Sequence, residues 1–366
     1  MKKSAKYIFL LLLLAVTACR KDDPAETGPS ISFRADTSAA ENVAATKATK
    51  TTDSNLTSNP FGVYGVYSAN KGDASGTNVF DNTSALEVKF NSASGTSGEW
   101  EYTRTGKEPK YYWKRNQYYR FRAYHPYTAS VETGGSNADK ILINYRIIQD
   151  QYDLLVAFAT RHPATDSEGT DRVPMNFQHA LSALRFRVAF DKTVAEGTTD
   201  TLTEFHISGV QAAGMLNYTY QKAGKDAQGN IIKEDYLTPV INWTSDAFDS
   251  TTEEFYQSTT QRKFGVYNPD DATSSVNLVD IYGSSDADNI VFAIPQTCSD
   301  PDDGDTTIHF KTTGGGDVDN TAVLPTLTWE PGKIYTYTLL IRKSSVGVVV
   351  SIKDWNEVQS TVDINI

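Results

Sequence analysis

The chain has 366 residues, with 34 Lys or Arg against 45 Asp or Glu, which gives a formal net charge of −11. This acidic balance argues against a nucleic-acid-binding protein, whose footprint is clustered Lys and Arg, so we expect no nucleic-acid partner. Two cysteines, Cys19 and Cys298, exclude a disulfide framework and a cysteine-rich zinc site. The length indicates about two domains, and 20 Tyr and 16 Phe with only 3 Met favour strands.

The first 18 residues have the pattern of an export signal. Three lysines precede an apolar run over 7–16, which is too short for a membrane-spanning helix of about 20 residues but suits a signal peptide. The run ends in Val-Thr-Ala-Cys, which resembles a bacterial lipobox. We therefore predict a lipoprotein signal peptide at 1–18 and lipid attachment at Cys19, which would bind outer-membrane lipid through its acyl chains. A plain signal peptide with a chance cysteine is the alternative.

The region from 19 to 55 is predicted to be a linker that contains one strand. Ile31-Ser32-Phe33 alternates apolar and polar residues, which is typical of a short strand. The following stretch, 36–60, has few large apolar side chains and predicts a flexible segment.

Strand patterns separated by turn residues then continue to the end of the chain, and no long amphipathic helix is evident. We predict two β-sandwiches, with a boundary in the polar stretch 164–172. In 184–190 the residues alternate, so we expect one buried face and one face that carries Arg185 and Arg187 to solvent. The predicted strands are 61–67, 111–113, 118–124, 141–145, 153–158, 175–182, 184–190, 202–207, 290–294, 307–310, 334–341 and 347–352.

No motif for catalysis or cofactor binding is present, so we expect no enzyme, no cofactor and no metal centre. His125 and His179 lack an evident nucleophile or carboxylate partner and are predicted to be structural. The run Asp300–Asp305 resembles a calcium loop, but Lys311 stands where the bidentate Glu belongs, and a solvated turn is the better interpretation.

Several segments in a fixed order resemble the fimbrillin family, the type V pilus subunits of Bacteroides-type bacteria. A lipoprotein signal is followed by Ile-x-Phe, Thr-Lys-Ala-Thr, Phe-Gly-Val-Tyr, Tyr-Arg-Phe-Arg-Ala-Tyr-His-Pro-Tyr, Phe-Gln-His-Ala-Leu, Phe-Ala-Ile-Pro-Gln and Trp-Glu-Pro-Gly-Lys. The resemblance implies an all-β fold of two tandem transthyretin-like β-sandwich domains, which we assign to 56–171 and 172–366.

The resemblance also implies an assembly route. A protease cuts the linker after a basic residue, the lipidated N-terminal piece leaves with its first strand, and a strand from a neighbouring subunit fills the groove. Family linkers carry Thr-Arg-Ala, whereas this chain has Lys, so either a different protease acts or the subunit stays lipidated. The candidate residues are Lys47 and Lys50 for cleavage, Ile31 and Phe33 for the displaced strand, and Val362, Ile364 and Ile366 for a donor strand. Pairing of the donor segment within its own domain is the alternative.

The predicted function is a cell-surface pilus subunit or pilus-associated adhesin, located in the fimbrium at the outer membrane. Its partners would be other pilus subunits in a homo- or heteropolymer. The sequence leaves open whether it is a stalk, tip or anchor subunit and to which surface ligand it adheres. The alternative is a surface glycan-binding lipoprotein that serves polysaccharide uptake through the aromatic faces of Tyr111, Tyr112 and Trp113.

Overall fold

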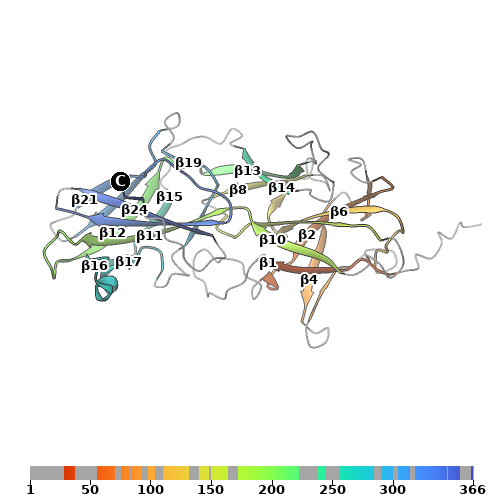
Figure 1. Cartoon of the computed structure of the whole chain (residues 1–366), viewed down its shortest axis with the longest axis horizontal. Helices are drawn as coiled ribbons and strands as arrows, with labels where there is room; N and C mark the ends of the chain where they lie inside the picture. The colour runs from red at the N-terminus through yellow and green to blue at the C-terminus, as the bar shows by residue number, and fades with distance from the viewer. Residues whose placement is uncertain are drawn as a thin grey trace, which may run out of the picture.

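The computed structural model is almost entirely β. It describes residues 29–37, 56–70, 76–81, 84–92, 98–103, 110–131, 140–147, 150–163, 172–221, 238–244, 255–283, 290–299, 304–313, 318–343, 345–354 and 364–365. The described strands lie along an elongated molecule, with β1, β2, β4 and β6 toward one end and β12, β16, β21 and β24 toward the other (Figure 1). The predicted all-β class is confirmed.

Eight strands at one end form a sheet in the order β3-β2-β4-β5-β1-β10-β9-β6. Because β2 also pairs with β6, seven of them close a circle, β2-β4-β5-β1-β10-β9-β6, which we call the N-terminal ring. A closed sheet leaves few open edges. The strands are β1 (Phe33–Thr37), β2 (Phe61–Ser68), β3 (Thr77–Asn78), β4 (Leu86–Asn91), β5 (Glu99–Glu101), β6 (Tyr118–His125), β9 (Leu155–Arg161) and β10 (Val173–His179).

The sheet at the other end follows the order β21-β20-β12-β16-β11-β23-β24-β25, with β15, β17 and β18 attached beside it. A separate pair is formed by β19 and β22, which come from the chain segments between β18 and β20 and between β21 and β23. We call the larger sheet the C-terminal sheet. Its elements are β11 (Ser182–Asp191), β12 (Thr199–Ser208), β15 (Phe255–Ser258), β16 (Arg262–Tyr267), β17 (Val279–Asp280), β18 (Val291–Ala293), β20 (Thr307–Thr312), β21 (Val318–Val323), β23 (Lys333–Ile341), β24 (Val346–Asp354) and β25 (Ile364–Asn365), and the pair is β19 (Thr297–Cys298) and β22 (Leu327–Thr328).

A third sheet joins the two halves of the chain. Its order is β14-β13-β8-β7, so strands from before and after the ring's last strand pair with one another. The strands are β7 (Ser130–Val131), β8 (Ile141–Arg146), β13 (Ala213–Gln221) and β14 (Thr238–Thr244). Strand β10, which follows the predicted boundary at 172, pairs with β1 and β9 of the ring.

Each of these regions has its own apolar core. One core fills the ring and includes Ile31, Phe61 and Phe121, and another fills the C-terminal sheet around Phe186 and Trp329. The third core lies between the ring and the third sheet and also contains Ala183, Phe292 and Ile334 of the C-terminal sheet. The ring and the C-terminal sheet are therefore joined through a shared apolar layer.

The prediction that the arginines of the alternating strand 184–190 face solvent was wrong for Arg185, because the shared apolar layer covers that face. Arg185 on β11 is buried, and Ala183 on the same face belongs to the third core, which explains why that face is covered. Arg187 pairs with Asp280, with 2.9 Å from Nε to Oδ1. Arg122 on β6 is fully buried, with its guanidinium 5.4 Å from the Phe158 ring.

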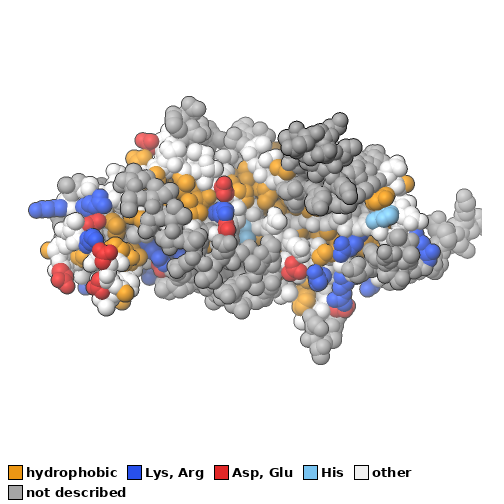
Figure 2. Space-filling model, viewed as in Figure 1, with side chains coloured by type: hydrophobic (Ala, Val, Ile, Leu, Met, Phe, Trp, Pro, Cys, Tyr) orange, Lys and Arg blue, Asp and Glu red, His pale blue; other side chains and the backbone are white. Residues whose placement is uncertain are grey.

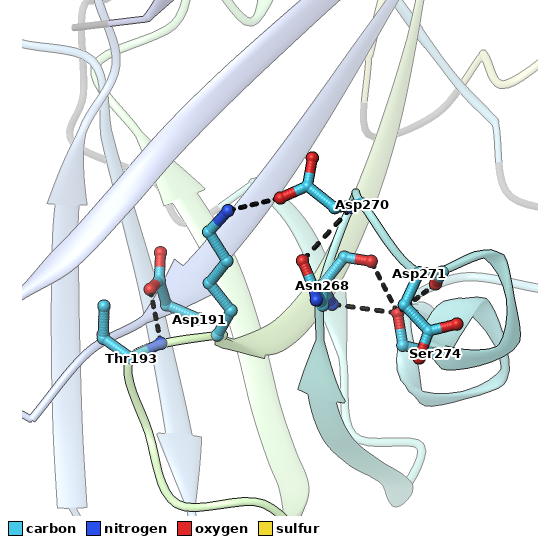
Figure 3. A network of polar contacts seen from close by, with 7 residues as sticks. Asp191, Thr193, Asn268, Asp270, Asp271 and Ser274 are labelled. Carbon is cyan, nitrogen blue, oxygen red and sulfur yellow. Dashed lines mark hydrogen bonds and ion pairs between the residues drawn. The ribbon is translucent and has the colours of Figure 1, made fainter.

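A short 3-10 helix, η2 (Ala272–Asn277), projects from the C-terminal sheet after β16. The turn before it is held by its own polar groups, because the Asn268 side chain accepts from the Asp270 N–H at 3.1 Å and the Asn268 N–H donates to Ser274 Oγ at 2.9 Å (Figure 3). Asp270 also pairs with Lys192 at 2.6 Å. On the face shown in Figure 2, acidic and basic side chains are intermixed around this projection.

Candidate functional site

The candidate site is the place of β1 within the N-terminal ring. β1 runs parallel to β10, from Phe33 opposite Val173 to Thr37 opposite Phe177. On its other edge, β1 meets β5 at one residue pair, Phe33 and Trp100. β1 therefore closes the ring between β5 and β10, although it comes more than a hundred residues before β10 in the chain.

Backbone hydrogen bonds extend this pairing to the residues before β1. The Ile31 N–H donates to the Tyr111 carbonyl at 2.7 Å, and the Trp113 N–H donates to the Pro29 carbonyl at 3.2 Å. On the opposite edge, the Val173 N–H donates to the Ser32 carbonyl at 2.8 Å. The inserted segment is thus continuous from residue 29 to residue 37.

The inward side chains of this segment are fully buried. Ile31 is 0% exposed and Phe33 is 1% exposed, so both belong to the core of the ring. Burial of a large apolar side chain contributes about 1.5–3 kcal/mol. The segment is consequently a structural part of the ring rather than a strand laid on its surface.

Three aromatic rings surround Phe33. Their centroids lie 5.7 Å away for Phe121, 6.1 Å for Tyr102 and 6.2 Å for Phe61, with interplanar angles of 65° to 90°. These are edge-to-face arrangements, in which the positive edge of one ring meets the negative face of another, and each adds about 0.5–1.5 kcal/mol to area burial. The site at Phe33 is therefore shaped for a flat ring.

A chain of tyrosine hydrogen bonds holds the segment at Ile31. The Tyr102 hydroxyl donates to the Ile31 carbonyl at 2.7 Å and accepts from the Tyr111 N–H at 3.2 Å. The Tyr111 hydroxyl in turn donates to Asp81 at 3.3 Å. The hydrogen bond from Tyr102 is made to the main chain of the segment and not to a side chain. Any strand that follows the same path can therefore accept a hydrogen bond from the Tyr102 hydroxyl.

The outward side of β1 is polar. The Arg34 side chain is 64% exposed and lies 3.6 Å from the Asp36 carboxylate. Arg172, just before β10, pairs with Glu99 on β5, so this ion pair links the two strands that flank β1. Solvated pairs of this kind contribute little to stability.

The structure describes some of the predicted site residues and not others. Ile31 and Phe33 lie together in the ring core, whereas Cys19, Lys47, Lys50, Val362 and Ile366 lie outside the described residues. Ile364 lies in β25, where its backbone is opposite Val350 of β24. The sequence did not indicate Tyr102 or Trp100, because no local pattern shows which distant strands meet β1.

His125 and His179 are both buried in the ring. His179 Nδ1 lies 2.9 Å from Asp153 Oδ1, so His179 has a carboxylate partner that the sequence did not indicate. Burial lowers the pKa of His125 to about 4, and the nearby Asp153 opposes this shift. In the residues that the structure describes, no group of three or more His, Cys, Asp or Glu is placed to hold a metal ion.

The aromatic run 111–113 does not form an open platform. Tyr111 and Trp113 are each 7% exposed and pack in the ring core, and only Tyr112 is half-buried. Trp113 lies edge-on to Tyr119, with centroids 4.6 Å apart. The faces of Tyr111 and Trp113 are thus occupied by protein, which removes the observation on which the glycan-binding alternative depended.

The arrangement defines an all-β protein in which a distant N-terminal segment completes a closed sheet. The fimbrillin-like family matches residues 46–355, and the chain belongs to this family. This membership supports a pilus subunit or adhesin with a surface location. No curated protein matches the sequence.

The chain is similar to several solved structures at low sequence identity. A fimbrial protein from Bacteroides vulgatus has a TM-score of 0.53 and 15% identity over 89% of this chain and 99% of its own. A candidate cell adhesion protein from Bacteroides ovatus has a TM-score of 0.49 and 14% identity over 92% of this chain and 100% of its own. The tip fimbrial protein Mfa3 from Porphyromonas gingivalis has a TM-score of 0.34 and 10% identity over 82% of this chain and 96% of its own.

Among the described residues, no helix has the length and apolar character needed to cross a membrane.

Proposed function

We propose that this chain is a non-enzymatic pilus subunit or pilus-associated adhesin that assembles with other subunits by replacement of β1. The proposal includes export through a signal peptide at 1–18 and lipid attachment at Cys19, which would hold the unassembled protein at the outer membrane. It also includes two sandwich domains of transthyretin-like topology. The sequence pattern of the first 19 residues supports the export step.

The observation that carries the proposal is the burial of Ile31 and Phe33 in a segment that closes the ring. If β1 left, β5 and β10 would become unpaired edges and the ring core would open to water. Exposed strand edges accept another strand readily, since the main-chain groups need partners. A strand from a neighbouring subunit would restore both the pairing and the core.

The segment between β1 and β2 contains the candidate cleavage residues, Lys47 and Lys50. A cut there would leave β1 held by non-covalent contacts alone. The alternating residues Val362, Ile364 and Ile366 at the end of the chain are the candidate donor, because they present three branched apolar side chains on one face of an extended strand. Donation requires that β25 separate from β24.

The proposal is tested by mass spectrometry of the cell-surface protein and by controlled cleavage. We expect a mature N-terminus just after Lys47 or Lys50 in the assembled form and acylated Cys19 in the unassembled form. Treatment of the purified protein with a lysine-specific protease should make β1 exchangeable, so that the cleaved chain takes up an added peptide of segment 29–37. A Lys47→Gln, Lys50→Gln double variant is the matched control and should take up no peptide. Cleaved protein that takes up no strand would contradict assembly by strand replacement.

A further inference from the structure

The segment that completes the ring places side chains of three different sizes, one after another, toward the core. Ile31, Phe33 and Ala35 lie on one face of an extended strand, since side chains alternate with a period of two. Ile31 and Phe33 are buried, while Ala35 is half-buried against the same core, opposite Met175 of β10. The positions therefore hold a branched aliphatic, an aromatic and a small residue in turn.

The middle position is the most selective of the three. Phe33 touches the rings of Phe61, Tyr102 and Phe121 through edge-to-face contacts at centroid distances of 5.7–6.2 Å. A branched aliphatic side chain has no flat face for these rings and leaves part of the space empty. Protein cores do not collapse fully around such a gap, so the loss of volume weakens binding.

The C-terminal segment of this chain does not have that order. It offers Val362, Ile364 and Ile366 on one face and contains no aromatic residue. In no register does an aromatic side chain lie at the position of Phe33. When Ile364 takes that position, Ile366 falls at the position of Ala35, which is half-buried and holds a small residue in β1.

We infer that the groove vacated by β1 accepts a strand from a different protein rather than from a second copy of this chain. The incoming strand carries an aliphatic residue followed, two positions later, by an aromatic one. This inference rests on the proposed strand replacement and adds the chemistry of the partner. The N-terminal ring of this chain then binds a strand of a different protein. The C-terminal strand of this chain, in turn, fits the groove of a different acceptor.

Peptide competition tests the inference on the full chain. A site for a sequence-specific protease is placed within 38–55, the linker is cut, and fluorescent peptides are added while anisotropy reports their incorporation. The peptides are the native segment 29–37, the same peptide with Phe33→Ile, the same peptide with Arg34→Ala, and the chain's own segment 359–366. Because the changes are in the peptide, the folding of the acceptor is the same in each measurement.

We expect the native and Arg34→Ala peptides to bind within about twofold of each other, since Arg34 points to solvent. The Phe33→Ile peptide should bind at least about tenfold more weakly, as should segment 359–366. If either of these two binds as tightly as the native peptide, the heterotypic inference is overturned while strand replacement stands. If the cut chain takes up no peptide, including the native one, strand replacement itself fails and the inference fails with it.

Discussion

Each end of the molecule contains a pair of parallel strands, and the two pairs are secured in different ways. In the C-terminal sheet, β23 pairs with β11 over eight residues and with β24 over nine. In the N-terminal ring, β1 pairs with β10 over five residues but with β5 at only one. The main chain thus secures β23 on both edges, whereas β1 depends more on the two side chains that it buries.

Connectivity strengthens this contrast. β23 is joined to β24 by a tight turn, in which the Arg342 N–H donates to the Ser345 carbonyl at 2.8 Å. β1 is joined to the next ring strand, β2, only through the long segment 38–60. β1 is therefore the strand that the proposed exchange would replace.

The largest effect is expected from truncating the aromatic anchor. Phe33→Ala should lower the free energy of unfolding of the ring by about 3–5 kcal/mol, because a buried ring is replaced by a cavity. Hydrogen exchange measured by mass spectrometry should rise in β5 and β10 and stay unchanged in β11 and β23. Arg34→Ala is the matched control and should change stability by no more than about 0.5 kcal/mol. Equal exchange in both regions would show that the two ends unfold as one unit.

Acidification should weaken the ring selectively through His125. Its pKa is lowered by burial to about 4, below the ordinary value of about 6.5, so the unfolded chain binds the proton first. Stability from this group is complete above pH 6.5 and falls as the pH drops toward 4, by up to about 3 kcal/mol.

Urea unfolding at pH 7 and at pH 4.5 measures this difference. His125→Gln should flatten the dependence in that interval, whereas His162→Gln, at an exposed position, should retain it. A His125→Gln profile parallel to that of the unmodified protein would rule out His125 as the source.

A smaller loss is expected where β2 packs closely on β6. A Cβ added at Gly62 would lie 2.4 Å from the buried Tyr124 ring, so Gly62→Ala forces this ring or one of the strands to shift and should cost about 1–3 kcal/mol. Thermal unfolding of the single variants and of the Gly62→Ala, Tyr124→Leu double variant gives the coupling. The double variant should be less destabilised than the sum of the two single ones, and strict additivity would argue against this clash.

The smallest effect is expected from the ion pair that links the strands beside β1. A double-mutant cycle with Arg172→Ala and Glu99→Ala should give a coupling energy of about 0.2–1 kcal/mol, since both side chains are about half exposed. The coupling should shrink at 1 M salt through screening. A coupling that is insensitive to salt would show that the pair contributes through packing.

The alternation of apolar and polar residues was sufficient to predict several of the long strands. The expected strands at 118–124, 184–190 and 334–341 correspond to β6, β11 and β23. Ile31-Ser32-Phe33 was also recognisable, because two apolar residues two positions apart in a polar region have few other structural uses. Family resemblance, rather than any local pattern, then gave this strand a functional meaning.

Contacts between segments that are far apart in the chain could not be predicted from local sequence patterns. Nothing in the alternation of β6 shows that a second layer covers Arg122, and nothing near His179 shows that Asp153 lies beside it. The three rings around Phe33 come from three separate segments, so the aromatic selectivity of the site emerges only when the ring closes. The aromatic run 111–113, predicted to be a strand, forms a single bridge between Tyr112 and Ser30.

The parallel orientation of β1 has a mechanical consequence. Tension applied along this strand from its N-terminal end loads the bonds to β10 and the contacts of Phe33 at the same moment, in shear, so they must fail together. Pairs that open one after another yield to much weaker tension. A fibre built from such joints would resist flow without any covalent link between its units.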